Sequence, residues 1–277
     1  MANQQANPDP RSLDFVWTDL ALSDSRRRIT DAQVEQFNRD GYFIIEGLIS
    51  EAEISSVRAV ADEYCSSIET LLESLPDERI FIAERGAITF APHAAAQFEA
   101  IREFVSSRSV TDVVFDVIGP DARLYHDQFV YKGHEKPRHF PWHQDNGYAF
   151  VSPESYLTIW IALSDAPVES GCVWVAPGMH RNGTLIHTYI EPLGWQCFDD
   201  PPLDPVAAPI KAGDAVVFSS IAPHLTGPNV SNEIRKAYIL QFVGLGATRF
   251  GNDDPPGGIS LDDDSKFPLV LHGGLPT

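Results

Sequence analysis

The chain has 277 residues, of which 43% are hydrophobic, and its 20 Lys and Arg stand against 39 Asp and Glu, which gives a net charge of −19. A strongly acidic surface repels phosphate backbones, so nucleic acid is excluded as an expected partner. No apolar run reaches the roughly 18 residues that a membrane-spanning helix needs, so we expect no membrane partner. The size and composition indicate one domain with a single large core.

Cysteine usage and the N-terminus bear on the compartment. Cys65, Cys172 and Cys197 are few, odd in number and without metal or redox spacing, which favours free thiols in a reducing compartment. Residues 1–10 are polar and lack the apolar stretch of a signal peptide. These features predict a cytoplasmic protein.

The first half of the chain carries mainly helical signals. Residues 1–28 show little periodicity and are expected to form a loose N-terminal arm before a single domain over residues 29–277. Helix N-caps precede the first two helices, and a glycine ends the first. The expected elements are a helix from Thr30 to about Asn38, a strand over Tyr42–Ile45, a helix from Ser50 towards Leu71, an irregular stretch over 73–97, and helices at Ala94–Ser106 and Ser109–Ile118.

From Arg123 onward the pattern changes to short β-rich segments. Gly, Pro, Asp and Asn punctuate them, as is typical of an all-β sandwich or barrel. The expected strands are Arg123–Tyr131, Leu157–Leu163, Val173–Ala176, Ala215–Phe218 and Ala237–Val243. Together with the preceding helices they predict a mainly β fold with flanking α-helices, a double-stranded β-helix (jelly roll, cupin-like).

Four residues suggest a metal site. His143 and Asp145 are two apart after a β-rich segment, so on a strand they would point to one face. His224 follows a second apolar strand, and two histidines with one carboxylate form the open ligand set of non-haem Fe(II) oxygenases. Arg235 opens another apolar strand, where a guanidinium needs an anionic partner.

Each of these signals has a simpler explanation when taken alone. Without their context, His143 and Asp145 are better explained as a surface histidine beside a solvated aspartate. His224 is compatible with a core or turn histidine. That explanation of His224 leaves Arg235 unexplained, so we favour the metal site.

The motifs resemble the phytanoyl-CoA dioxygenase-like family of Fe(II)/2-oxoglutarate oxygenases over roughly residues 30–245. The similar stretches are Asp31–Tyr42, Pro141-Trp142-His143-Gln144-Asp145, Ile159–Leu163, Glu169–Trp174, Pro177-Gly178-Met179-His180, and His224–Ser231 followed by Arg235. Several motifs in the same order are far more specific than any one of them.

The resemblance implies the site residues and the cofactors. His143, Asp145 and His224 would hold Fe(II), while Arg235 and Thr226 would hold the far carboxylate of 2-oxoglutarate. Thr158 and Trp160 would line the cosubstrate, and Gln128 would reach its near carboxylate. With O₂ as oxidant, the enzyme would hydroxylate or otherwise oxidise a C–H bond of a small-molecule substrate and release succinate and CO₂. Because Asp145 is present, hydroxylation, desaturation or ring formation is favoured over the halogenation of relatives that lack this carboxylate.

Several nearby residues receive weaker assignments. Many relatives have glutamine at position 126, where this chain has His126, which weakens the assignment of Gln128 and leaves His126 as a possible cosubstrate contact. Lys132 is expected to border the entrance. His180 and His187 are rejected as ligands. The aromatic residues around the metal motif either wall the pocket or pack the core; they are Phe140, Trp142 and Tyr148.

Two other functions are compatible with this fold. One is a catalytically silent jelly-roll binding or regulatory protein, which has no need of the complete set of four residues. The other is a cupin-type metalloenzyme without an oxo-acid, against which Arg235 argues. The sequence does not identify the substrate, whose selectivity we assign to residues 73–97, 133–140 and 181–209. We expect a monomer or a homodimer.

Overall fold

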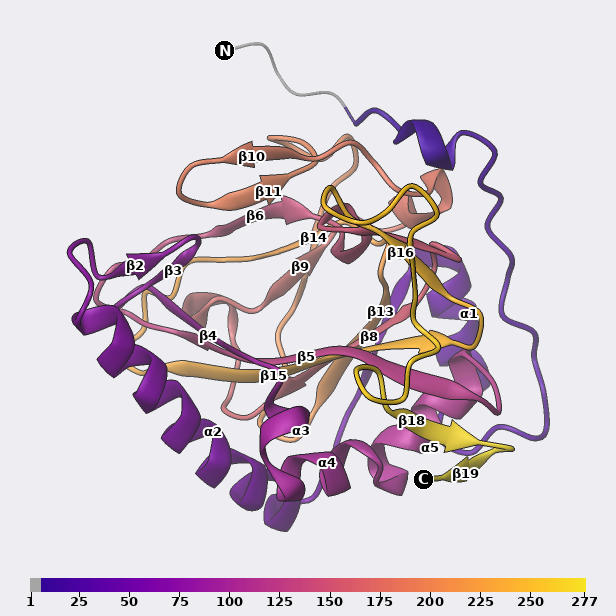
Figure 1. Cartoon of the computed structure of the whole chain (residues 1–277), viewed down its shortest axis with the longest axis horizontal. Coiled ribbons are helices and arrows are strands. Elements are labelled where there is room, and N and C mark those ends of the chain that lie inside the picture. The colour runs from indigo at the N-terminus through magenta and orange to yellow at the C-terminus, as the bar shows by residue number, and fades with distance from the viewer. Residues whose placement is uncertain (1–5) are drawn as a thin grey trace.

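Two antiparallel β-sheets face each other in the computed structural model, which describes residues 6–277 (Figure 1). The large sheet has the strand order β1-β13-β8-β15-β5-β4-β3-β2, with β18 and β19 attached to β5. Its strands are β1 (Tyr42–Ile45), β13 (Ala215–Ser219), β8 (Leu157–Ala162), β15 (Arg235–Gly244), β5 (Ala122–Lys132), β4 (Ile88–Pro92), β3 (Ala83–Glu84), β2 (Arg79–Ile80), β18 (Leu269–His272) and β19 (Leu275–Pro276).

The small sheet has the order β12-β9-β14-β6 and covers one face of the large sheet. Its strands are β12 (Val206–Ala208), β9 (Val173–Val175), β14 (His224–Thr226) and β6 (Phe140–His143). Short strands outside the two sheets form a hairpin, β10 (Thr188–Ile190) with β11 (Gly194–Gln196), and a three-stranded edge, β17 (Ile259–Ser260), β16 (Thr248–Phe250) and β7 (Phe150–Ser152).

Alternation along the strands of the large sheet separates two cores. Ile159 and Ile161 of β8 pack towards the helices, whereas Trp160 and Ala162 face the small sheet. Period-two alternation therefore sends every second side chain between the sheets. The inward-facing positions of β15 are Arg235, Ala237, Ile239 and Gln241, in register with Trp160 and Ala162.

Helices cover the outer face of the large sheet (Figure 1). They are α1 (Asp31–Asp40), α2 (Glu51–Glu73), α3 (Ala94–Gln97), α4 (Glu99–Val105) and α5 (Arg108–Val117). Thr30 and Ser50 each form a capping box, with Gln33 and Glu53 respectively. These caps stabilise both helices by satisfying their free N–H groups.

The fold prediction is confirmed, with local corrections. The helix expected over Ala94–Ser106 is broken into α3 and α4 at Phe98, whose backbone is extended. The stretch 73–97, expected to be irregular, contains β2, β3 and β4, which extend the large sheet beyond β5. His224 belongs to β14 of the small sheet, not to the end of β13. Arg235 opens β15, but β16 to β19 follow it.

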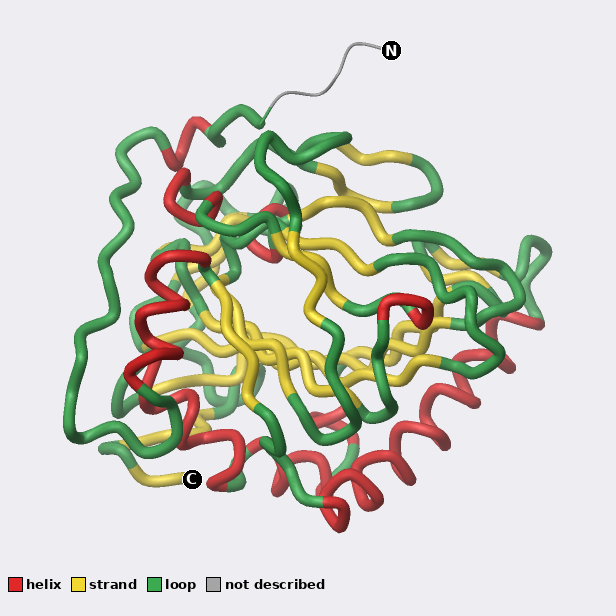
Figure 2. Tube along the Cα trace, turned by 180° about the vertical axis from the view of Figure 1, so that it is seen from behind, coloured by secondary structure: helices red, strands yellow, loops and turns green. Residues whose placement is uncertain are grey.

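The N-terminal segment runs along the side of the domain (Figure 1, Figure 2). The backbone N–H of Asp9 donates to Thr184, and Ser12 hydrogen-bonds the buried Glu154. Trp17 packs against Phe37 with ring centroids 5.7 Å apart. Residues 6–28 are therefore bonded to the domain rather than loose. Residues 1–5 of the predicted arm lie outside the described residues, and its separation from residue 29 onward stays a prediction.

The structure also bears on the expectations for the cysteines and for membrane-spanning helices. Cys65, Cys172 and Cys197 are buried and unbridged. Across residues 6–277, none of the helices is both long and apolar enough to cross a bilayer. The cytoplasmic location and the oligomeric state stay predictions.

Candidate active site

Three predicted ligands converge between the two sheets. The Nε2 atoms of His143 and His224 lie 4.0 Å and 3.8 Å from Oδ1 of Asp145. One ligand atom from each residue lies within 4.8 Å of the other two. His143 ends β6, and its partner across the small sheet is His224 at the start of β14. The structure therefore brings together residues that lie far apart in the sequence.

Both histidines have a fixed ring nitrogen. Nδ1 of His143 lies 2.8 Å from the carbonyl oxygen of Pro141, and Nδ1 of His224 lies 3.0 Å from that of Ala222. A carbonyl only accepts hydrogen bonds, so each Nδ1 must carry the proton. Nε2 is then left with a free lone pair that faces Asp145, which is the tautomer a metal ligand needs. Burial also lowers the pKa of His143 well below its usual value.

Asp145 is held by Thr158. The sequence suggested that Asp145 lies on a strand. In the structure Asp145 begins a 3₁₀ turn over Asp145–Gly147. Gln144 is extended, with φ −114° and ψ 143°, so His143 and Asp145 still point to the same site. The hydroxyl of Thr158 donates to Oδ2 of Asp145 at 2.5 Å, which leaves Oδ1 towards the histidines.

Gln144 anchors the metal motif, a role that sequence reasoning missed. Its side-chain amide donates to the carbonyls of Gly183 and Ile221 at 2.9 Å and 2.7 Å and accepts from the N–H of Leu185 at 2.6 Å. Its backbone N–H donates to Nε2 of His187 at 2.9 Å. His187 is thus occupied by the turn that carries the ligands, which agrees with its rejection as a ligand.

Arg235 lies in the same cavity as the three ligands. It is 1% exposed, and none of its three side-chain nitrogens has a hydrogen-bond partner among the described residues. Its guanidinium carbon lies 5.0 Å from the centre of the Trp160 ring. Burial lowers the pKa of Arg235 to about 10, so it stays charged at neutral pH. A buried, charged guanidinium without a hydrogen-bond partner is suited to bind a carboxylate ligand.

Lys132 is the neighbour of Arg235 across the β5–β15 pair, and it is buried, not at the entrance. Its Nζ lies 2.9 Å from the hydroxyl oxygen of Thr226, 3.0 Å from the Thr226 carbonyl and 2.5 Å from that of Gly227. Three oxygens match the three N–H donors of an ammonium group. Burial and the charge of Arg235 lower the pKa of Lys132 well below its usual value.

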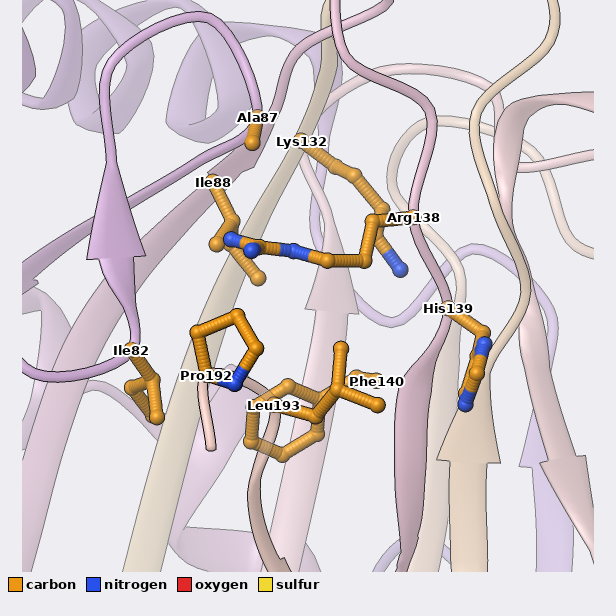
Figure 3. A pocket seen from close by; sticks show the side chains of 9 residues that line it. All are labelled: Ile82, Ala87, Ile88, Lys132, Arg138, His139, Phe140, Pro192 and Leu193. Atoms are coloured by element: carbon orange, nitrogen blue, oxygen red, sulfur yellow. The ribbon is translucent and has the colours of Figure 1, made fainter. Parts of the chain in front are cut away.

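The Lys132 side chain lines a second, small pocket, which shares Ile82, Ile88 and Phe140 with the cavity of Arg235 (Figure 3). There Arg138 extends towards Ile88, and His139 points away from the other side chains. The pocket has a volume of about 10 Å³. It therefore has room for about one water molecule and for no organic ligand.

The large cavity has a volume of about 570 Å³. The predicted site residues that line it are His143, Asp145, His224, Arg235, Thr226, Trp160 and Gln128, and His126 also does so. Thr158 is fully buried and bonded to Asp145, so it contacts the ligand set and not the cavity. Phe140 and Tyr148 line the cavity, whereas Trp142 packs against Phe198.

The segments to which selectivity was assigned contribute unequally. Residues 80–83, 88, 90 and 92 and Phe140 line the cavity. No described residue of 181–209 does so, because that segment lies over the small pocket and the metal motif. The sequence missed lining residues from other elements, among them Leu72, Tyr125, Tyr156 and Gln241. Single residues of these types on predicted helices and strands carry no signal that separates a cavity wall from a core.

The chain matches the family model of phytanoyl-CoA dioxygenase (PhyH) over residues 37–237. It belongs to this family. A methylphosphonate hydroxylase of Gimesia maris is 28% identical over 229 residues, 78% of this chain and 82% of the relative. A phytanoyl-CoA dioxygenase of Arabidopsis thaliana is 23% identical over 263 residues, 82% of this chain and 93% of the relative.

Solved structures of oxygenases share the fold. The non-heme alpha ketoglutarate dependent carbocyclase SnoK from nogalamycin biosynthesis has a TM-score of 0.73 at 25% identity, over 88% of this chain and 97% of that chain. EctD from S. alaskensis, solved with 2-oxoglutarate and 5-hydroxyectoine, has a TM-score of 0.67 at 20% identity, over 94% and 92%. The predicted family, jelly-roll fold and enzyme class, a 2-oxoglutarate-dependent non-haem iron dioxygenase, are confirmed. The predicted cofactors, Fe(II), 2-oxoglutarate and O₂, are those of this class.

Proposed function

We propose that this protein oxidises an unactivated C–H bond of a small-molecule metabolite and converts 2-oxoglutarate and O₂ into succinate and CO₂. The observation that carries the proposal is the combination of the three converging ligands with a buried, unpartnered Arg235 in one cavity. A metal site alone is compatible with many hydrolases and cupins. The free guanidinium supports an oxo-acid cosubstrate in addition.

In this proposal, His143, Asp145 and His224 hold Fe(II) on one face and leave other positions open. Bound Fe(II) supplies the oxidation of substrate that is coupled to decarboxylation of the cosubstrate. Arg235 binds the far carboxylate with its two-pronged guanidinium. Thr226, which lines the cavity beside it, adds a hydroxyl donor. Trp160 forms the wall on which the guanidinium rests.

Gln128 has a place in this proposal beside His126. Gln128 pairs with Ile239 and His126 with Gln241 across β5 and β15, on the inward face of the large sheet. Both side chains line the cavity, so both are candidates for the near carboxylate of the cosubstrate or for the substrate. Burial lowers the pKa of His126 to about 4, so at neutral pH its ring is an uncharged donor or acceptor.

The fit of the residues argues against the two rival functions. A silent binding protein has no use for two histidines whose Nδ1 atoms are locked so that both Nε2 atoms face a carboxylate. A cupin without an oxo-acid would leave Arg235 buried without a counter-ion, which is costly.

Succinate formation tests the proposal. Purified protein with Fe(II), ascorbate and 2-oxoglutarate is expected to release succinate slowly without substrate and faster with a true substrate from a metabolite panel. Wild type that neither binds 2-oxoglutarate nor releases succinate above a His143→Ala, His224→Ala double variant would reject the proposal.

A further inference from the structure

We infer that the substrate is an uncharged molecule with a mainly apolar body, bound against a wall built by the end of α2 and the β2–β3 hairpin. This inference rests on the proposed function and names its substrate class. Four features carry it: the apolar wall of the cavity, the assignment of every lining charge to the metal and cosubstrate, the pairing of the cations around the hairpin, and an exposed aromatic residue that lines the cavity.

The wall lines the same cavity as the three predicted metal ligands. Apolar side chains come from three consecutive elements, the last turns of α2, the hairpin and β4. They are Ile68, Leu71, Leu72, Ile80, Phe81, Ile82, Ala83, Ile88, Phe90 and Pro92. Binding sites for small organic ligands have this character, with a mostly apolar lining and few polar groups. The wall therefore offers surface for a hydrocarbon body.

The charges that line the cavity are already assigned. Among the described lining residues the carboxylate is Asp145 and the guanidinium is Arg235, and no lysine occurs. His126 is the lining histidine outside the ligand set, and its pKa is lowered to about 4 by burial. An ionic substrate would lose its hydration in this cavity without meeting a partner, which is costly.

Cations on and beside the β2–β3 hairpin are also neutralised. Arg138 lies 2.8 Å and Lys136 3.2 Å from carboxylate oxygens of Glu84, which belongs to the hairpin. Arg79 forms an ion pair with Glu191, and Arg85 lies 3.1 Å from Glu78. These pairs attach the hairpin to neighbouring loops. They leave no free cation there, in the described part of the chain, for a phosphonate or for the phosphates of a CoA thioester.

Phe81 marks the mouth of the cavity. It stands at the tip of the hairpin with 79% of its surface exposed, and it lines the cavity. Its φ of 51° lies in the left-handed region, which a bulky side chain rarely adopts. Strained residues of this kind cluster at functional sites. An exposed phenyl ring at the entrance offers an apolar body its first contact.

Polar groups without charge lie near the metal instead. Tyr125, Tyr156 and Gln241 line the cavity, and the rings of Tyr125 and Tyr156 are 5.5 Å apart. Gln241 pairs with Thr158, the residue that holds Asp145. An alcohol, ketone or ester group of the substrate would find neutral partners here. A volume of about 570 Å³ falls in the range of about 300–1,000 Å³ that drug-sized ligands occupy.

The test compares three probes with one naphthalene skeleton: 1-naphthalenemethanol (neutral), 1-naphthoate (anionic) and 1-naphthylmethylammonium (cationic). Equilibrium dialysis is done without oxygen on the full chain loaded with Fe(II) and 2-oxoglutarate. We expect the neutral probe to bind at least tenfold more tightly than either ion. Equal or tighter binding of an ion, or no measurable binding of the neutral probe, would overturn the inference.

Variants locate the binding surface. Leu71→Ser and Phe81→Ser change exposed residues of the wall, 46% and 79% exposed, and are expected to weaken binding of the neutral probe at least threefold. Leu203→Ser is the control, because Leu203 is 51% exposed, close to the value for Leu71, and does not line the cavity. This variant should bind the neutral probe as wild type does. If both wall variants bind the probe as wild type does, the wall is not the substrate site.

A parallel measurement separates this inference from the proposed function. 2-Oxoglutarate binding is measured in the same samples for wild type and Arg235→Ala. Intact, Arg235-dependent binding of 2-oxoglutarate together with a preference for an ionic probe would reject the substrate class alone. Absence of 2-oxoglutarate binding would reject the proposed function as well.

Discussion

The two ends of the cavity treat charge in opposite ways. At the β15 end, Arg235 is 1% exposed, and no carboxylate pairs with it among the described residues. At the hairpin end, the cations Lys136 and Arg79 pair with the carboxylates of Glu84 and Glu191. Positive charge is therefore unpaired where the carboxylate of 2-oxoglutarate is expected to bind. It is paired with carboxylates where the apolar substrate is expected to bind. Unpaired buried charge is costly, so its position is informative about the ligand.

Loss of a histidine ligand should have the largest effect. We expect His143→Ala and His224→Ala each to reduce iron affinity by more than about 100-fold, since loss of a supporting residue alone typically costs 10–100-fold. Iron content and succinate formation measure the outcome. His272→Ala, which changes an exposed histidine bonded to Asp121, is the control. Normal turnover at stoichiometric iron in either ligand variant would remove that residue from the site.

Removal of the Arg235 guanidinium tests the end of the cavity where 2-oxoglutarate is expected to bind. We expect Arg235→Ala to weaken 2-oxoglutarate binding at least about tenfold, because a hydrogen bond to a charged group contributes roughly 1.5–3 kcal/mol. Iron affinity should change little. Arg39→Ala removes an exposed arginine paired with Asp40 and serves as the control. Unchanged affinity for 2-oxoglutarate would leave the buried charge of Arg235 without a ligand to explain it.

Thr158→Val distinguishes two roles for a residue that the sequence assigned to the cosubstrate. The hydroxyl holds Asp145 at 2.5 Å. We therefore expect iron affinity to fall by about tenfold and 2-oxoglutarate affinity, measured at saturating iron, to stay near that of wild type. The reverse pattern would return Thr158 to the cosubstrate site.

Lys132 should act through Thr226. Because Nζ of Lys132 donates to the Thr226 oxygen, the hydroxyl proton of Thr226 is free to turn towards the cosubstrate. We expect Lys132→Met and Thr226→Val each to weaken 2-oxoglutarate binding several-fold, and the double variant to lose little more than one of them. Independent, additive losses in this double-mutant cycle would mean that Lys132 acts by its charge alone.

His180 does not line the cavity, so it should affect the free energy of unfolding and not the activity. His180 is fully buried beside Trp17, and burial lowers its pKa to about 4. The unfolded histidine binds a proton near pH 6.5, so the unfolding free energy should fall as pH drops from about 6.5 to about 4. We expect His180→Leu to flatten that slope in denaturant titrations without changing succinate formation. An unaltered slope would show that His180 does not contribute to it.

Local signals in the sequence predicted much of the structure. Thr30 and Ser50 cap the predicted helices, and β1 spans the predicted Tyr42–Ile45. These features depend on neighbouring residues, so the sequence alone contains them. The resemblance of the motifs added further residues that line the cavity, such as Thr226, Trp160 and Gln128.

Features that depend on distant partners were missed. β4 is a strand because it pairs with β5, and its own five residues do not distinguish a strand from a loop. Lys132 was expected near solvent, as lysines usually are, but the oxygens of Thr226 and Gly227 allow its burial. Tyr125 on β5 and Tyr156 just before β8 line the cavity together with Asp145, although they lie far apart in the sequence.

The unpartnered guanidinium of Arg235 has a consequence for how long the protein survives in a cell. Burial without a hydrogen-bond partner destabilises the fold, and an acid that pairs with it relieves that cost. A ligand present at 100 times its dissociation constant stabilises a fold by about 2.7 kcal/mol. The melting temperature and the resistance to proteases should therefore rise with the supply of 2-oxoglutarate, and the abundance of the enzyme would follow the abundance of the acid it consumes.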